Sequence, residues 1–168
     1  GIHRPHDENH STPWLYEQNE LGWNYRLTDL QAALGISQLN KLEESLTKRR
    51  ELASRYHQLL GEKPFSEHFD LPLPNEGNAW HLFVIRFKES GVRDRAHKFL
   101  KSMEILTQVH YVPLHRHPYF KKQMGEVSLP GAERFFEGCL SIPLYPQLSK
   151  DEQDRVMEAL ARFIKRER

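Results

Sequence analysis

The sequence changes from irregular to periodic within residues 22–31, which read Gly22-Trp23-Asn24-Tyr25-Arg26-Leu27-Thr28-Asp29-Leu30-Gln31. Thr28 and Gln31 have the spacing of a capping box, in which the threonine hydroxyl accepts a hydrogen bond from a first-turn N–H and the glutamine side chain reaches back to the cap. Asp29 favours the positive end of the helix dipole. We therefore expect a helix to begin here.

Apolar side chains recur at helical spacing from this cap to residue 60, and Gly61 and Pro64 end the pattern. The positions on this face are Leu30, Leu34, Leu42, Leu46, Ala53, Tyr56 and Leu60. An unbroken helix over residues 28–60 would be about 50 Å long and would reach a second domain or subunit. Gly35 is its weakest point, since glycine costs about 1 kcal/mol relative to alanine in a helix interior. The missing side chain of Gly35 suits close packing there.

The rest of the sequence alternates extended and helical patterns. We expect strands at residues 80–87, 105–112 and 140–142, helices at residues 92–103 and 131–138, and a loop or extended link at residues 64–78. A second capping box, Ser149-Lys150-Asp151-Glu152, begins a last helix with an apolar face at Val156, Met157, Leu160, Phe163 and Ile164. These elements predict an α+β fold: a short, mainly antiparallel sheet packed with helices and led by one long helix.

The composition predicts one ordinary domain and excludes several classes of protein. Among the 168 residues, 24 Lys and Arg nearly balance 23 Asp and Glu, so a nucleic-acid binder is not expected. No apolar run approaches the ~20 residues of a membrane helix. The single Cys139 excludes an internal disulfide and fits a reducing compartment, so we expect a cytoplasmic protein. The first residues contain neither an initiator Met nor a signal peptide, which predicts a fragment of a longer chain.

The histidines are the first candidates for chemistry. His110, His115 and His117 cluster around Pro113, and a second group lies at residues 3–10, but residues 111–120 contain no acid that would complete a metal site, so we predict none. Two alternatives stay open: partly buried hydrogen-bonding side chains at a strand end, or a polar rim at which His110, His115 and Tyr119 face a ligand. Nucleophile elbows, phosphate loops and apolar lysine contexts are missing from the sequence, which predicts a catalytically incomplete chain.

The polar run before the first helix also has two interpretations. It can be an elaborate N-terminal cap, with Trp23 and Tyr25 packed on the helix. It can instead bind an anion, because Asn24 offers an amide N–H, Arg26 a cationic fork and the helix its positive end. A phosphate is the natural ligand for such a site.

Three blocks of sequence carry a resemblance to a known family. They are residues 22–35 with Gln38-Leu39 and Arg49-Arg50, then Val109-His110-Tyr111-Val112-Pro113-Leu114-His115 with Pro118-Tyr119-Phe120, and last Leu140-Ser141-Ile142-Pro143-Leu144-Tyr145-Pro146. Together they resemble the pyridoxal-phosphate-dependent sugar aminotransferases of the DegT/DnrJ/EryC1/StrS group. The unbroken His-Tyr-Val-Pro-Leu-His run is most similar to the UDP-4-amino-4,6-dideoxy-N-acetyl-altrosamine transaminase type, which aminates C4 of a UDP-linked keto-sugar on the route to pseudaminic acid.

The resemblance implies that residues 28–168 are the C-terminal small domain of a fold-type-I aminotransferase and that residues 1–27 connect it to the missing large domain. That large domain would carry the Schiff-base lysine, so the fragment is expected to be inactive and not to retain the cofactor. Asn24 and Arg26 are implied to contact the phosphate of pyridoxal 5′-phosphate in the neighbouring subunit of a homodimer.

The second block is implied to lie near the substrate, which makes His110, Tyr111, His115 and Tyr119 candidate substrate-binding residues. The parent enzyme would transfer an amino group from an amino-acid donor, glutamate, to a nucleotide-linked keto-sugar. The alternatives are a sugar dehydratase domain that uses the same cofactor, a non-catalytic helical interaction module, and a zinc protein.

Overall fold

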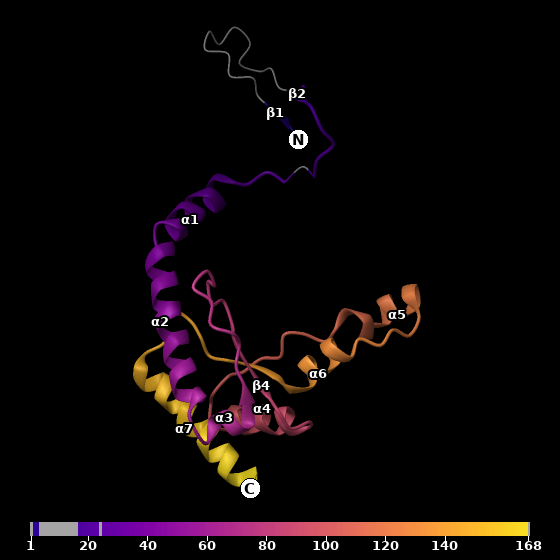
Figure 1. Cartoon of the computed structure of the whole chain (residues 1–168). Coiled ribbons are helices and arrows are strands. Elements are labelled where there is room, and N and C mark those ends of the chain that lie inside the picture. Colours follow the sequence, from indigo (N-terminus) through magenta and orange to yellow (C-terminus); the bar gives the residue numbers. More distant parts are fainter. Residues whose placement is uncertain (1, 4–16, 24, 168) are drawn as a thin grey trace. The chain divides into compact units, whose positions relative to one another are not determined.

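The computed structural model describes residues 2–3, 17–23 and 25–167. The chain divides into two units, Gly1–Lys41 and Leu42–Arg168 (Figure 1). In the first unit, β1 (Ile2–His3) pairs antiparallel with β2 (Glu17–Gln18), and α1 (Asp29–Leu39) follows. A short ladder thus occurs in a segment that was expected to be irregular.

The first capping box is confirmed. The Gln31 N–H donates to Thr28 Oγ1 over 3.3 Å, and the Thr28 N–H donates to Gln31 Oε1 over 3.0 Å. The prediction of one unbroken helix is wrong, because α1 ends at Leu39 and α2 (Leu42–Gly61) begins after a turn. In that turn the Lys41 N–H bonds the carbonyl three residues back, at Gln38, which tightens the last turn of α1 and ends it.

Gly35 marks neither a helix break nor a close contact. It lies inside α1, and a Cβ built on it would meet nothing within 4 Å among the described residues. Close packing at Gly35, which the sequence favoured, is therefore not seen in this part of the chain.

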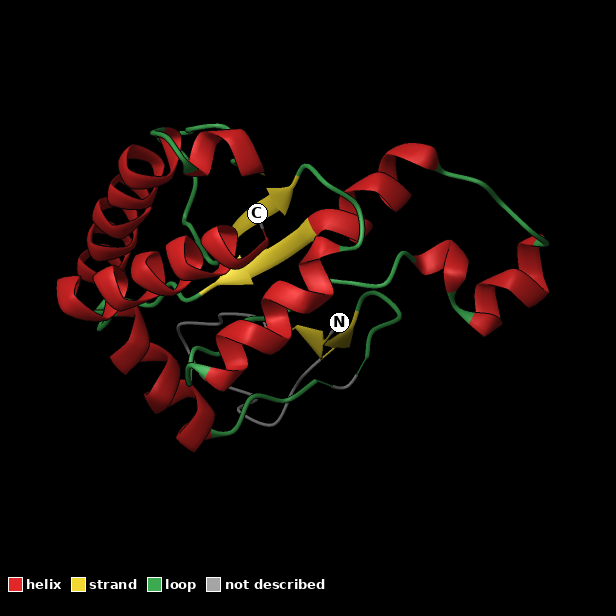
Figure 2. Ribbon diagram, turned by 90° about the horizontal axis from the view of Figure 1, so that it is seen from below, coloured by secondary structure: helices red, strands yellow, loops and turns green. Residues whose placement is uncertain are grey.

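The second unit is built on a three-stranded antiparallel sheet in the order β3-β4-β5 (Figures 1 and 2). The strands are β3 (Phe69–Asp70), β4 (Phe83–Phe87) and β5 (Cys139–Ile142). The sheet is packed with α2, α4 (Val92–Ser102) and α7 (Lys150–Glu167), which supply most of the buried apolar side chains. The predicted α+β class is confirmed.

The central strand is shorter than the sequence predicts. Trp80 is buried but has a φ of 48°, which lies outside the extended region, and the Arg49 guanidinium donates to the carbonyls of Trp80 and His81. The strand therefore starts at Phe83. Phe83, Ile85 and Phe87 are buried, whereas Val84 and Arg86 on the other face are partly exposed.

The last helix agrees with the sequence analysis. Glu152 N–H donates to Ser149 Oγ, and Glu152 Oε2 accepts from the Ser149 N–H over 2.7 Å, which completes the second capping box. The five apolar positions expected on the inner face of this helix are all buried. The predicted helices at residues 92–103 and 131–138 correspond to α4 and α6 (Pro130–Gly138), and β5 contains the predicted strand at residues 140–142.

Two other predictions need correction. The segment at residues 64–78 is not all loop, because it contains α3 (Phe65–His68) and β3. The strand expected at residues 105–112 is reduced to a single bridge between Gln108 and Ser141. Pro113 has no N–H with which to extend a ladder, and the chain turns into the short 3-10 helix η1 (Leu114–Arg116), followed by α5 (Pro118–Met124).

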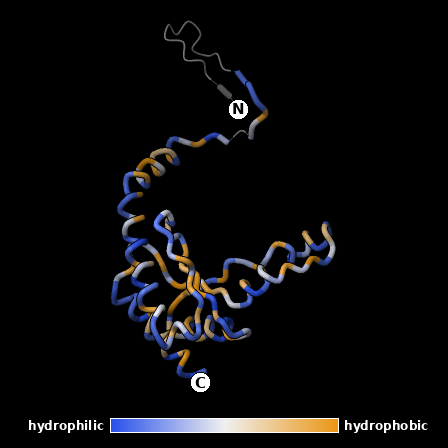
Figure 3. Tube along the Cα trace, viewed as in Figure 1, coloured by the Kyte–Doolittle hydropathy of each residue, from blue (hydrophilic) through white to orange (hydrophobic). Residues whose placement is uncertain are grey.

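Hydropathy follows this architecture. Figure 3 shows apolar residues concentrated along the strands at the centre of the second unit, while the outer turns of its helices are mostly polar. Within the described ranges, no helix is both long and apolar enough to cross a lipid bilayer.

Candidate functional site

The candidate substrate-binding residues lie on one connection, residues 108–119, which we call the site loop. It leaves the sheet at the bridge between Gln108 and Ser141, passes through η1 and enters α5. At the bridge the Gln108 N–H donates to the Ser141 carbonyl over 3.1 Å, and the Ser141 N–H donates to the Gln108 carbonyl over 2.8 Å. The beginning of the site loop is therefore fixed to the edge of β5.

His110 and Tyr111 form the first part of the site loop. His110 Nδ1 lies 2.8 Å from Oγ of Ser141, which is buried in β5. The Tyr111 ring meets the His110 ring edge to face, with 4.7 Å between the ring centroids, and the peptide bond between them is cis. Tyr111 is 74 % exposed. The His110 imidazole is thus anchored to the sheet through Ser141, and the Tyr111 phenol faces solvent.

His115 is placed differently, because its side chain is buried. Its Nε2 lies 3.1 Å from Glu133 Oε1 in α6, and the same carboxylate accepts the Leu129 N–H over 3.2 Å. The Leu129 N–H, and after it the bond to His115, hold the pKa of Glu133 below its ordinary value. This pair ties η1 to α6 beside an open pocket of about 200 Å³. The pocket is lined by His115, Glu133, Val127 and the charged side chains Arg116, Lys121, Glu126 and Glu137.

Tyr119 lies on α5 and is mostly exposed, with its ring edge to face against Phe120 at 5.3 Å between centroids. The structure therefore brings His110 and Tyr111 into contact, pairs His115 with Glu133, and leaves Tyr119 on the surface of a short helix.

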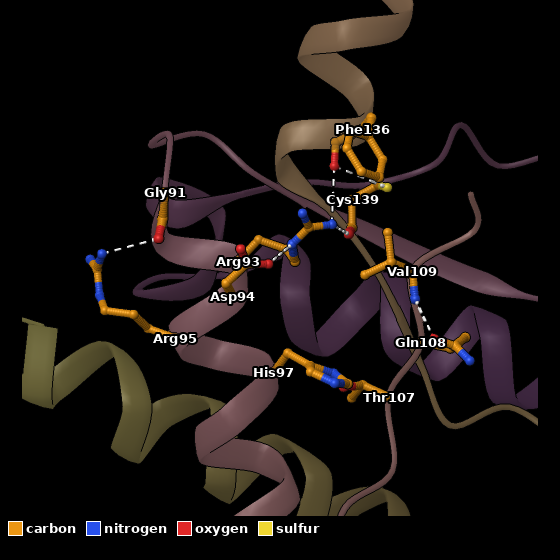
Figure 4. A network of polar contacts seen from close by, with 10 residues as sticks. All are labelled: Gly91, Arg93, Asp94, Arg95, His97, Thr107, Gln108, Val109, Phe136 and Cys139. Atoms are coloured by element: carbon orange, nitrogen blue, oxygen red, sulfur yellow. Dashed lines mark hydrogen bonds and ion pairs between the residues drawn. The ribbon is translucent and has the colours of Figure 1, made fainter. Parts of the chain in front are cut away.

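A buried arginine supports the junction between α6 and β5 (Figure 4). The Arg93 guanidinium donates to the Asp94 carboxylate over 2.5 Å and to the carbonyls of Phe136 and Cys139 over 3.1 and 3.4 Å. It also lies over the Phe136 ring, 5.2 Å from the centroid. Because β5 carries Ser141 and α6 carries Glu133, this cation stabilises the elements that hold His110 and His115.

A second contact in Figure 4 fixes the segment that leads into the site loop. His97 Nδ1 of α4 lies 2.7 Å from Thr107 Oγ1, one residue before Gln108. Nearby, burial raises the pKa of the Cys139 thiol, which keeps it protonated and fits the expected inert core thiol.

The candidate cofactor-binding residues lie in the first unit. Asn24 lies outside the described residues. Arg26 is exposed and precedes the N-cap Thr28 by two residues. Trp23 and Tyr25 stack on each other, with 6.4 Å between centroids, and are 82 % and 90 % exposed. They do not pack on the helix, so the capping interpretation fails for these two rings.

Sequence reasoning missed three residues that shape the site. Ser141 was part of a recognised block, but only its partner His110 was considered. Glu133 and Arg93 look in the sequence like ordinary charged helix residues, and no local signal identifies them. Across residues 2–3, 17–23 and 25–167, no three His, Cys, Asp or Glu side chains gather as metal ligands would.

Comparisons with known proteins give a family match. The profile of the DegT/DnrJ/EryC1/StrS aminotransferase family matches residues 4–161. The spore coat polysaccharide biosynthesis protein SpsC of Bacillus subtilis (strain 168) is 38 % identical over 160 residues, which are 90 % of this chain and 40 % of SpsC.

Two solved structures extend the likeness to the fold. Helicobacter pylori PseC, an aminotransferase involved in the biosynthesis of pseudoaminic acid, has a TM-score of 0.76 at 26 % identity, over 90 % of this chain and 41 % of PseC. NtdA of Bacillus subtilis, solved with bound cofactor PMP, has a TM-score of 0.75 at 33 % identity, over 89 % of this chain and 35 % of NtdA.

The chain thus spans about 40 % of the length of its relatives. The family profile nevertheless covers nearly all of it, including the site loop and the segment before α1. On this evidence, the chain belongs to the DegT/DnrJ/EryC1/StrS aminotransferase family.

Proposed function

We propose that the chain is the C-terminal domain of a pyridoxal-phosphate-dependent aminotransferase that acts on a nucleotide-linked keto-sugar. The observation that carries this proposal is the family match over residues 4–161. SpsC is named for polysaccharide biosynthesis and PseC for pseudoaminic acid biosynthesis, which favours a sugar substrate. The likeness to PseC also favours the UDP-4-amino-4,6-dideoxy-N-acetyl-altrosamine transaminase type. We propose glutamate as the amino donor.

In this proposal the N-terminal unit positions the cofactor. Pyridoxal phosphate, when bound, withdraws electrons from the carbon that exchanges its amino group. The Arg26 guanidinium, exposed beside the N-terminal end of α1, fits the phosphate of this cofactor because it is a cation at a helix end that favours anions. Asn24 would add a neutral hydrogen bond worth roughly 1 kcal/mol, which orients the group rather than reacting with it. Residues 1–27 would connect the C-terminal small domain, residues 28–168, to the large domain.

The site loop would bind the sugar substrate. Tyr111 and Tyr119 offer exposed phenols, and His110 offers an imidazole that is anchored on Ser141. His115 would act indirectly, because its pair with Glu133 fixes the position of η1 and thereby of the exposed part of the loop. We further propose a cytoplasmic homodimer. The buried free thiol of Cys139 fits the reducing compartment, and the exposed apolar side chains of α1 favour a subunit interface.

The test uses the full-length protein that contains this chain. We expect it to bind pyridoxal phosphate, seen as visible absorbance, and to transfer an amino group from glutamate to a UDP-linked 4-keto-sugar, followed by mass spectrometry of the product. Loss of water without gain of an amino group would identify the dehydratase instead. A protein with neither cofactor absorbance nor a changed sugar would contradict the proposal.

Asn24→Ala in the same protein tests the role of the first unit. We expect weaker retention of pyridoxal phosphate during dialysis, since one phosphate contact is lost, while the rate of amino transfer at saturating cofactor stays near wild type. Asn40→Ala is the matched control, because Asn40 is an exposed asparagine in the turn after α1. Equal cofactor retention in all three proteins would remove Asn24 from the site.

A further inference from the structure

Ser141 is a buried polar residue whose backbone is already fully used. It is 5 % exposed and pairs with Val84 of β4 on one side and Gln108 on the other. Its N–H and carbonyl both bond Gln108. The side-chain hydroxyl therefore plays no part in the ladder, and among the described residues it has one hydrogen-bond partner, His110 Nδ1 at 2.8 Å.

This single contact decides the tautomer of His110. A neutral imidazole carries its hydrogen on one ring nitrogen and accepts through the other. If Nδ1 carried the hydrogen, the Ser141 oxygen would accept it, and the buried hydroxyl hydrogen would be left without an acceptor in the described chain. Leaving a buried donor unpaired costs its full desolvation free energy. If Nδ1 is unprotonated, the Ser141 O–H donates to it and both groups are satisfied.

The orientation of the ring is restricted as well. The backbone bridge at Gln108 fixes the chain two residues before His110, and the Tyr111 ring lies against the imidazole edge to face. Ser141 of the sheet therefore holds the His110 ring at Nδ1, and the Tyr111 ring packs against it on one side. Its remaining polar atom, Nε2, is the one that is left for a ligand.

We propose that Ser141 is a positioning residue that holds His110 as the Nε2–H tautomer, so that His110 offers a hydrogen-bond donor to the substrate. This inference rests on the proposed function, in which the site loop binds a nucleotide-linked sugar. A donor at Nε2 pairs with an oxygen acceptor, such as a keto, hydroxyl or phosphoryl oxygen, and does not pair with an amino group that only donates. Ser141 thus sets which kind of substrate atom His110 can recognise.

The test is nuclear magnetic resonance of the protein labelled with ¹⁵N-histidine, recorded without ligand at a pH where His110 is neutral. His110→Gln identifies the two His110 nitrogen signals among those of the ten histidines. We expect a protonated Nε2 and an unprotonated Nδ1 that is shifted by the bond it accepts. A protonated Nδ1 in the wild type would overturn the proposal, and this outcome depends on no variant.

Ser141→Ala should move the ¹⁵N chemical shift of His110 Nδ1 to the value of an unprotonated nitrogen that accepts no hydrogen bond. Ser141→Thr, which keeps the hydroxyl, should restore the wild-type shift. Ser102→Ala is the control, because the exposed Ser102 hydroxyl donates to the Phe99 carbonyl within α4 and does not contact His110. Identical His110 signals in wild type and Ser141→Ala would also overturn the proposal. Because the tautomer is measured without substrate, failure of the amino-transfer assay would contradict the proposed function and leave this result standing.

Discussion

The residue that most clearly couples pH to stability is His57 in α2. Its ring packs edge to face against Trp80 and Phe83, at 5.2 and 5.0 Å between centroids. Both ring nitrogens are buried, and neither has a hydrogen-bond partner in the described part of the chain. Burial lowers the pKa of His57, because the charged form would lose its hydration. The folded protein therefore favours the neutral ring.

We expect His57 to make the protein less stable in mild acid. With a folded pKa below the unfolded value of about 6.5, the stability that depends on the neutral ring is complete above that pH and is lost as pH falls through the folded pKa. His57→Phe should abolish this slope and raise the free energy of unfolding by roughly 1 kcal/mol near neutral pH, since it removes an unpaired polar group. Urea unfolding at several pH values measures both effects.

The control for His57 is His81→Phe, at an exposed position on the segment before β4. It should leave the slope between neutral pH and pH 5 as in the wild type. If His57→Phe keeps the wild-type slope, the ring of His57 is not the group that titrates.

Gly138, at the end of α6, is a second position where one residue decides stability. A Cβ built there would lie 2.5 Å from the Phe87 carbonyl oxygen and 2.9 Å from Arg86 Cγ. Gly138→Ala should therefore cost about 1–3 kcal/mol through overpacking. Gly131→Ala in the same helix is the matched control, because nothing lies within 4 Å of its Cβ. Thermal unfolding compares the two, and equal melting temperatures would refute the close approach.

Among the helices, α6 is one whose stability depends on a titrating side chain, the Glu133 carboxylate. This group accepts hydrogen bonds from Leu129 N–H and His115, which hold its pKa below the ordinary 4.5. The stability it contributes is complete above the unfolded pKa and is lost as pH falls through the folded pKa. Glu133→Gln should therefore flatten the acid side of the stability curve, measured by urea unfolding between neutral pH and pH 3. Glu137→Gln, in the same helix and beside the same pocket, should keep the wild-type slope.

The helix α1 is a different case, because none of its residues is buried. Leu30, Leu34, Ile36 and Leu39 are 61–82 % exposed, and isolated helices of fewer than ~12–15 residues are marginal in water. In the proposed homodimer these side chains contact the partner subunit. Leu34→Asp in the full-length protein should therefore shift it from dimer to monomer in analytical ultracentrifugation, whereas Asn40→Asp, at the exposed C-cap after α1, should not. A Leu34→Asp protein that stays dimeric would remove α1 from the interface.

At the scale of the whole molecule, the described chain has one well-packed core, and contacts from this core hold the site loop in place. Arg49 donates to the carbonyls of Trp80, His81 and Leu144, and Tyr56 Oη donates to the Pro143 carbonyl. These bonds join α2 to the segment before β4 and to the segment after β5, which meet at one end of the sheet because Phe83 pairs with Ile142. The core of the second unit thereby positions β5, and β5 positions the site loop through Ser141.

The sequence by itself determined the features that depend on near neighbours. The two capping boxes, the inner face of α7 and the helices α4 and α6 follow from contacts between residues three or four positions apart, so pattern alone predicts them. The same holds for the family resemblance, which rests on short runs of residues, and for the predicted α+β class.

Only the tertiary structure decided the rest. The end of α1 before Asn40 and Lys41, the reduction of the strand at residues 105–112 to one bridge, and the late start of β4 all override a regular local pattern. His110 meets Ser141 across 31 positions of sequence, and His115 meets Glu133 across 18. Such pairs form only when the sheet and helices bring distant segments together, and no periodicity within either segment encodes which partner it will meet.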